Sequence, residues 1–305
     1  MASPPPMRPA DPAFVGARSI AGAEDGVRAV LVGVPYDGAV SYRPGASEGP
    51  GALRRASDSI ETYCPIVGRD LGDGSVADAG DLVLPPDPTP DTFVTWGRRV
   101  VAQLDAAFGS VPRLAVGGDH AAALPFLLAA CRRYPDLRIL HIDAHGDLRE
   151  TWDGTPWSHA CVMARVLDAL GPEGEVASWG IRSGPAEEFA RARSDPRVVP
   201  LGPTAAAGPA LAARWAAGRR PVYVTLDLDG LALGESTGTG TPEPGGLPLA
   251  AVEEALARLA RGRAPVVGAD LVELSPPHDP SGASAVTAAR AARALLMALG
   301  AGTPP

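Results

Sequence analysis

The chain has 305 residues, of which 46% are hydrophobic and 20% charged, and its formal net charge is −8. These values are typical of a globular protein built from one large α/β domain or two smaller ones. An acidic chain without a basic run is a poor candidate for binding nucleic acid, which attracts clustered Lys and Arg. No uninterrupted apolar run is long enough to span a membrane, so we expect no membrane partner.

The cysteines and the chain ends indicate a cytoplasmic protein. Cys64, Cys131 and Cys161 are odd in number and widely spaced, which argues against a disulfide framework or a zinc ribbon. The proline-rich residues 1–13 lack the apolar core of a signal peptide, and we expect them to form a flexible arm. Residues 301–305 are expected to be a similar C-terminal tail.

Short apolar runs alternate with longer segments of helical periodicity. Strands are predicted over Val27–Val34, Arg113–Val116, Arg138–Ile142, Val176–Trp179, Pro221–Leu228 and Ala264–Ala269. Helices are predicted over Phe93–Phe108, Ala121–Tyr134, Ala160–Leu170, Pro209–Ala217, Leu249–Arg261 and Ala283–Leu299. This alternation predicts an α/β fold with a mostly parallel sheet covered on both faces, within a single domain over residues 14–300. The Gly/Pro-rich stretch Gly234–Pro248 is too long for a turn and is interpreted as a functional loop.

Polar residues follow four of the predicted strands. They lie in the segments Gly117–His120 (GGDH), Asp143–Asp147 (DAHGD), Asp227–Gly230 (DLDG) and Asp270–Glu273 (DLVE). The carboxyl ends of parallel strands form the ligand crevice of open α/β sheets. Carboxylates and imidazoles from all four segments are therefore predicted to converge.

The spacing within these segments points to a metal centre. Asp143, His145 and Asp147 recur at every second residue, as do Asp227 and Asp229, and would share one face of an extended segment. Gathered carboxylates need a cation, and this number suits two metals about 3.5–4 Å apart. Ligands rich in oxygen, with imidazole and without thiolate, favour manganese, leaving iron, cobalt and nickel open. Each segment alone has a simpler interpretation as a turn, a cap or a tight strand exit.

The ordered motifs resemble those of the ureohydrolases, the arginase and agmatinase family. The resemblance begins with VGVPYDG at Val32–Gly38 and GPGALR at Gly49–Arg54, and it extends over nearly the whole chain. It continues through GGDH, DAHGD, SHA at Ser158–Ala160, DLDG, GTGTPEPGG at Gly238–Gly246 and DLVELSPPHD at Asp270–Asp279. The fold implied is a three-layer αβα sandwich, arginase-like, in a homo-oligomer that is a trimer or hexamer.

The resemblance also implies a ligand set for two Mn2+ ions. One metal would be held by His120, Asp143, Asp147 and Asp227. The other would be held by His145, Asp143, Asp227 and Asp229, so that Asp143 and Asp227 bridge the pair.

The chemistry implied is hydrolysis of a guanidino compound to urea and an amine. Asp147 would hydrogen-bond the attacking hydroxide and pass its proton to the leaving amine. Glu273 would hold the guanidinium by charge-assisted hydrogen bonds, and His159 would shuttle protons. Without the resemblance, His159 is simply a histidine at the start of a helix, and Cys161 a small apolar residue.

Several departures from the family pattern bear on the substrate. The family's LDPxxAPG stretch is replaced by Leu231–Thr237 (LALGEST), and Ala121 follows GGDH where the family often has Ser. The pocket-wall segment Leu148–Trp157 lacks a clear arginase pattern, which favours agmatine or a guanidino acid such as 4-guanidinobutanoate over arginine. Within this segment, Trp152, Asp153 and Trp157 either shape a site for the substrate tail or pack the loop.

Three other functions remain open at this stage. A formiminoglutamate hydrolase on the same scaffold would release formamide, and an amidinohydrolase could act on the guanidine of a specialised metabolite. A non-catalytic, metal-binding paralogue with a regulatory role is compatible with the changed Ala232–Thr237 segment.

Overall fold

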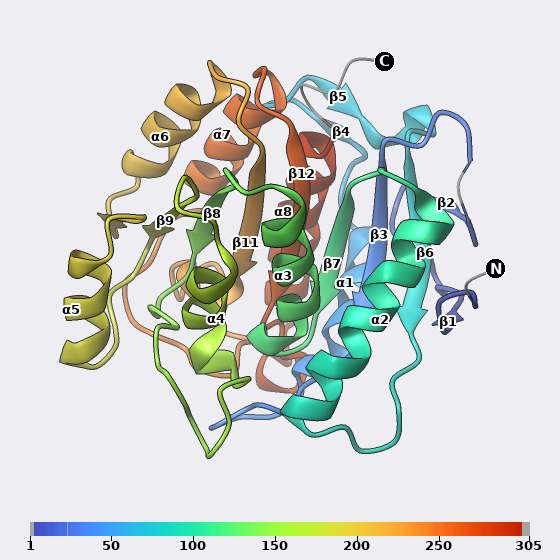
Figure 1. Ribbon diagram of the computed structural model, residues 1–305. Coiled ribbons are helices and arrows are strands. Elements are labelled where there is room, and N and C mark those ends of the chain that lie inside the picture. Colours follow the sequence, from blue (N-terminus) through green and yellow to red (C-terminus); the bar gives the residue numbers. More distant parts are fainter. Residues whose placement is uncertain (1–2, 23, 301–305) are drawn as a thin grey trace.

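The computed structural model describes residues 3–22 and 24–300. Its centre is a sheet with the strand order β1-β6-β3-β7-β12-β11-β8-β9-β10, with β2 beside β6 (Figure 1). In that order the strands span Met7–Arg8, Val76–Leu82, Ala29–Val34, Arg113–Gly117, Val266–Val272, Val222–Asp227, Arg138–Ile142, Glu175–Trp179 and Val198–Gly202, and β2 spans Arg18–Ser19. All pairs run parallel except β1 with β6. A separate hairpin joins β4 (Tyr63–Cys64) to β5 (Arg69–Asp70).

Helices cover both faces of the sheet, which confirms the predicted α/β sandwich (Figure 1). One face carries α2 (Pro90–Phe108), α3 (Leu124–Arg133) and α4 (Val162–Ala169). The other carries α1 (Gly49–Ser57), α6 (Ala207–Ala216), α7 (Leu249–Ala260) and α8 (Ala283–Ala298). Helix α5 (Ala186–Ser194) packs beside β10.

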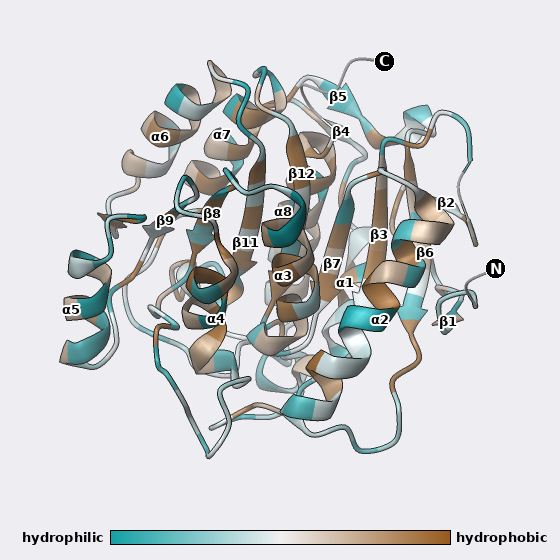
Figure 2. Ribbon diagram, in the orientation of Figure 1, coloured by the Kyte–Doolittle hydropathy of each residue, from teal (hydrophilic) through white to brown (hydrophobic). Residues whose placement is uncertain are grey.

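The alternation of side chains along the strands builds two cores. In β3, Val30, Val32 and Val34 join the apolar cluster under α2 and α3, whereas Leu31 joins the cluster on the opposite face. The central strands are accordingly mostly apolar, and the exposed surfaces of α2 and α5 are largely hydrophilic (Figure 2). A strand buried on both faces is expected to be rich in hydrophobic residues, as these are.

The predicted strands correspond to β3, β7, β8, β9, β11 and β12. The bounds of one strand and of one helix differ from the prediction in ways that affect the site. β12 extends to Val272, so Asp270 lies within the strand and not after it, opposite Thr225 of β11. Before α3, residues His120–Ala123 form a 3-10 turn, so the α-helix begins at Leu124 and not at Ala121.

Part of the expected N-terminal arm belongs to the central sheet. Met7 and Arg8, within the expected flexible arm, pair with Leu82 and Asp81 of β6. The expected tail at 301–305 lies outside the described residues. Among the described helices, none has the length and apolar character that crossing a membrane requires.

Candidate metal centre

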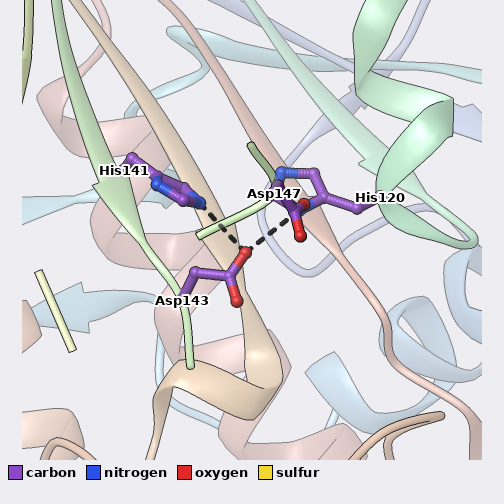
Figure 3. Close-up of side chains that lie close together, drawn as sticks. All are labelled: His120, His141, Asp143 and Asp147. Atoms are coloured by element: carbon purple, nitrogen blue, oxygen red, sulfur yellow. Dashed lines mark hydrogen bonds and ion pairs between the residues drawn. The ribbon is translucent and has the colours of Figure 1, made fainter. Parts of the chain in front are cut away.

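The candidate centre lies at the carboxyl ends of four adjacent strands, β7, β12, β11 and β8. His120 follows β7, Asp143 follows β8, Asp227 ends β11 and Glu273 follows β12. Because these strands are neighbours in the sheet, side chains that are far apart in the sequence meet in one place. Figure 3 shows His120, Asp143 and Asp147 directed toward one another.

His120 is the hub of the first group of ligands. Its Nδ1 lies 2.9 Å from Asp147 Oδ2, 3.1 Å from Asp143 Oδ2 and 3.6 Å from Asp227 Oδ2. All four side chains are buried. This arrangement gathers one imidazole nitrogen and three carboxylates, a donor set that suits a hard or borderline divalent cation.

A second group lies beside the first and shares Asp143 with it. His145 Nδ1 is 3.1 Å from Asp229 Oδ2 and 3.7 Å from Asp143 Oδ1. Asp143 therefore directs one oxygen to each group, which is the geometry that a bridging carboxylate needs. All six residues that the sequence predicts as ligands lie in these two groups.

The backbone that creates this convergence is not simply extended, contrary to the spacing argument. Asp147 has a φ of 51°, in the left-handed region, and Asp229 lies in a 3-10 turn over Leu228–Gly230. The turn is fixed locally, because Asp229 N–H donates to Asp227 Oδ1 at 2.8 Å. The chain thus bends back on itself after each strand and brings the alternate residues together.

The pKa shifts of the ligand side chains indicate that the cluster carries an excess of negative charge. Burial, and then repulsion from Asp229 and Asp143, raise the pKa of Asp227 well above its ordinary value. Burial alone would lower the pKa of His120, but hydrogen bonds to Asp143 and Asp147 raise it well above the usual range. Carboxylates that compete for protons in this way are stabilised by a cation. The donor set and its charge therefore fit divalent metal ions.

A buried relay behind His120 was not predicted from the sequence. Thr225 Oγ1 lies 2.6 Å from Asp270 Oδ1 and 3.0 Å from His120 Nε2. The hydroxyl has one hydrogen, and a carboxylate can only accept, so Thr225 donates to Asp270 and accepts from His120 Nε2–H. In the neutral ring, which is the form that binds a metal ion, His120 Nδ1 is then the lone pair that faces the carboxylates. Burial raises the pKa of Asp270 to about 6.

His141 is a second unpredicted neighbour of the centre. Its Nε2 lies 3.0 Å from Asp143 Oδ2, from the opposite side to His120 (Figure 3). Burial acts to raise the pKa of Asp143, but hydrogen bonds from His120, His141 and His145 hold it well below its ordinary value. His141 lies inside a predicted apolar strand, where only the alternation of its neighbours signals that it shares a face with Asp143.

The centre opens into a cavity of about 160 Å³, whose lining includes His159 and Glu273. Glu273 has a φ of 66°, and its Oε1 accepts His120 N–H at 2.9 Å. His159 Nδ1 donates to the Ala39 carbonyl, and its Nε2 lies 3.1 Å from Ser41 Oγ. Because Nδ1 carries that hydrogen, Nε2 of the neutral ring is a lone pair. Burial lowers the pKa of His159 and favours this neutral form.

Some residues of the two loops that were expected to border the pocket, Leu148–Trp157 and Gly234–Pro248, line the cavity. Arg149 and Trp152 line the cavity, as does Thr241 of the Gly234–Pro248 stretch, whose Oγ1 donates to Asp229 Oδ2 at 3.0 Å. Trp157 instead lies under the Arg98 guanidinium, 5.1 Å from the ring centre. Within the described chain, no residue of Ala232–Thr237 lines this cavity.

An αβα sandwich with carboxylate and imidazole ligands at its strand ends defines a class of metal-dependent hydrolases. Residues 27–298 match the model of the arginase family. The chain is 39% identical over 272 residues to the agmatinase of Bacillus anthracis, covering 88% of this chain and 90% of that protein. This chain therefore belongs to the arginase family.

Solved structures agree with this assignment. The agmatine ureohydrolase of Thermoplasma volcanium matches with a TM-score of 0.73 and 29% identity, over 90% of both chains. The proclavaminate amidino hydrolase of Streptomyces clavuligerus matches with a TM-score of 0.79 and 26% identity, over 99% of both chains.

Proposed function

We propose that this protein is a binuclear-metal amidinohydrolase that cleaves a small guanidino compound of the agmatine type to urea and an amine. The observation that carries the proposal is the position of Asp143, whose two oxygens face two adjacent groups of ligands. Membership of the arginase family and the similarity to agmatinases support the reaction class.

The two metal sites are assigned as follows. His120, Asp143, Asp147 and Asp227 would hold one cation, and Asp143, His145, Asp227 and Asp229 would hold the other. When bound, such a pair lowers the pKa of water and supplies hydroxide near neutral pH. The oxygen-rich donor set favours manganese.

Three side chains are assigned to the reaction itself. Glu273 holds the guanidinium with the oxygen that His120 N–H does not occupy. Asp147 accepts a proton from the attacking water and passes it to the leaving amine. His159, held by Ala39 with Nε2 as a lone pair, carries protons between the cavity and solvent.

The remaining assignments rest on the family resemblance. Residues 14–300 form one catalytic domain, which assembles into a trimer or hexamer in the cytoplasm. Light scattering on the purified, metal-loaded protein measures the oligomer directly.

The decisive experiment measures urea release by the manganese-loaded protein from a panel of guanidines. The panel contains agmatine, arginine, 3-guanidinopropanoate, 4-guanidinobutanoate and formiminoglutamate, with formamide measured for the last. We expect urea from at least one guanidine, with two metal ions bound per chain. Formamide release alone, or silence across the panel with both metals bound, would contradict the proposal.

Asp143→Asn supplies the matched inactive control. The amide removes the negative charge that both ligand groups share, so we expect loss of bound metal and of nearly all activity. Metal content is measured by elemental analysis beside urea release. An Asp143→Asn protein that keeps two metals and full activity would refute the assigned ligands.

A further inference from the structure

The ring of His159 is held by a distant segment of the chain. His159 begins a 3-10 turn over His159–Cys161, but its Nδ1 meets the Ala39 carbonyl and its Nε2 lies 3.1 Å from Ser41 Oγ. The Ala39 carbonyl determines which nitrogen carries the hydrogen in the neutral ring. Ser41, on the other nitrogen, has no role in the proposed reaction.

Ser41 lies on a segment that is fastened to the site on both sides. Before it, Ala39 N–H donates to Oδ2 of the fully buried Asp119 at 2.8 Å. After it, the Arg43 guanidinium donates to the Thr239 carbonyl at 2.5 Å. The position of the Ser41 hydroxyl is therefore set by contacts on either side of it in the chain.

The Ser41 hydroxyl is in contact with both His159 and the cavity. Ser41 is exposed and His159 is partly buried, and both line the cavity. A proton that enters or leaves Nε2 of His159 therefore does so beside this hydroxyl.

A hydroxyl can bond to Nε2 whether or not the imidazole is protonated. In the neutral ring Nε2 is a lone pair, and the Ser41 O–H donates to it. In the imidazolium Nε2–H donates and Ser41 Oγ accepts, which requires only rotation of the hydroxyl. A carboxylate would favour the imidazolium, and an ammonium would favour the neutral ring. A hydroxyl favours neither form, which suits a group that must gain and lose a proton.

The other hydroxyl near the ring lies on the wrong nitrogen for this role. Ser158 Oγ is 3.2 Å from Nδ1, whose hydrogen faces the Ala39 carbonyl in both charge states of the ring. Ser158 is also buried. Among the described residues that hydrogen-bond the His159 ring, only Ser41 contacts the nitrogen that gains and loses the proton.

We propose that Ser41 is a positioning residue for the proton shuttle, and that its hydroxyl holds Nε2 of His159 in place in both charge states of the ring. The inference rests on the proposed amidinohydrolase activity and on the role of His159 in it. Without the hydroxyl, the ring is held through Nδ1 alone, and Nε2 is less often in the position that proton transfer needs.

The first test measures urea release from agmatine by the manganese-loaded protein. Ser41→Ala removes the hydroxyl, and we expect kcat to fall by about 3- to 10-fold, the effect of one lost hydrogen bond. KM should change by less than about twofold, because the lost contact is made to His159 and not to the substrate. Ser41→Thr keeps the hydroxyl and should recover most of the wild-type kcat.

Tyr42→Phe is the control, because it removes a hydroxyl from the neighbouring residue, which is 71% exposed and does not line the cavity. Its kinetics should equal those of the wild type. A Ser41→Ala variant with the wild-type kcat, or a Ser41→Thr variant as slow as Ser41→Ala, would overturn the proposal.

A double-mutant cycle shows whether Ser41 acts through His159. In a His159→Ala background the partner of the hydroxyl is gone, so Ser41→Ala should no longer change kcat. The same loss in both backgrounds would show that Ser41 acts elsewhere and would overturn the proposal. A His159→Ala variant as active as the wild type would do so as well.

Modification of His159 by diethyl pyrocarbonate tests the contact without turnover. The reagent attacks the lone pair of a neutral imidazole, and mass spectrometry of the His159 peptide gives the rate. A hydroxyl bonded to Nε2 protects it, so Ser41→Val should be modified several times faster than Ser41→Thr, which has nearly the same shape. Equal rates would overturn the inference.

The two proposals fail in different ways. If the wild type hydrolyses no guanidine, the proposed function fails, and the modification rates alone decide whether Ser41 holds His159. If the wild type hydrolyses agmatine and the Ser41 variants match it in kcat, only the inference fails.

Discussion

Thr225 determines which nitrogen of the neutral His120 ring carries the hydrogen, and so which nitrogen is free to bind a metal ion. Its single hydroxyl hydrogen goes to Asp270, so the His120 Nε2–H must donate to it. The Thr225→Val variant removes this acceptor without changing the size of the side chain much. We expect metal affinity to fall by about 10- to 100-fold, as for other residues that orient a ligand. A competition titration against a coloured chelator measures the affinity.

Thr225→Ser keeps the hydroxyl and serves as the control. It should retain most of the metal affinity of the wild type, because Ser can donate to Asp270 and accept from His120 in the same way. An affinity in Thr225→Val equal to that of Thr225→Ser would show that the relay does not orient His120.

The site residues that were predicted share a feature of the sequence that the unpredicted site residues lack. His120, Asp143 and Asp227 lie at or just after apolar runs, where a polar residue stands out. Thr225 and His141 lie inside such runs, where the sequence does not show which residues of other strands they contact. Their roles depend on contacts between strands or across the cavity, which a linear pattern does not contain.

At the scale of elements, α1 is fastened to β6 by a buried ion pair. Arg54 Nε lies 2.8 Å from Asp78 Oδ2, Arg54 Nη2 lies 3.0 Å from Asp78 Oδ1, and both side chains are almost fully buried. Arg54→Met would leave Asp78 buried without its cation. We expect the free energy of unfolding to fall by about 3–5 kcal/mol, measured by urea denaturation.

Arg55→Met is the control for Arg54, because Arg55 is the next residue of α1 and is exposed. Its effect should stay within about 0.5 kcal/mol. Equal effects of the two substitutions would mean that the buried pair does not fasten α1 to the sheet.

The first turn of α8 depends on Asp279. Its carboxylate accepts Ser284 N–H at 2.7 Å and Ser281 N–H at 3.0 Å. Burial acts to raise the pKa of Asp279, but hydrogen bonds from Ser281 and Ser284 outweigh it and lower the pKa from 3.8 to about 2. The charged form is therefore stabilised in the folded protein. This stabilisation is complete well above pH 3.8 and is lost as the pH falls toward 2.

The difference in unfolding free energy between the wild type and Asp279→Asn tests this linkage. We expect a difference of about 1–2 kcal/mol near neutral pH, and a smaller one on acidification from about pH 5.5 to 3. Glu254→Gln, on the exposed side of α7, controls for the lost charge. A difference that does not change with pH would contradict the assigned shift.

Helices and strands were predictable where the local sequence has a clear hydrophobic pattern. The apolar runs that became β3, β8 and β11 are buried on both faces and needed no distant partner to be recognised. β6 was missed because its sequence, VADAGDL, contains two aspartates, Asp78 and Asp81, which pair with Arg54 of the distant α1. The short, charged α5 and the proline-containing β10 likewise gave weak local signals.

At the scale of the whole molecule, metal binding is coupled to stability. The ligands come from three separate segments of the chain, which meet only in the folded state. Metal at 100 times its dissociation constant would stabilise the fold by about 2.7 kcal/mol. We therefore expect excess chelator to lower the Tm of the wild type by several degrees. Scanning calorimetry measures this shift, and Asp143→Asn should show a much smaller one.

The strands at the two ends of the sheet restrict how copies of this chain associate. β10 contains Pro200, which has no N–H to donate, and its register with β9 shifts after that residue. At the other end, β1 is only two residues long and covers part of β6. Short, irregular edge strands are poor templates for edge-to-edge aggregation. Homo-oligomers of this chain should therefore form through helices and loops, without a sheet that continues from one subunit into the next.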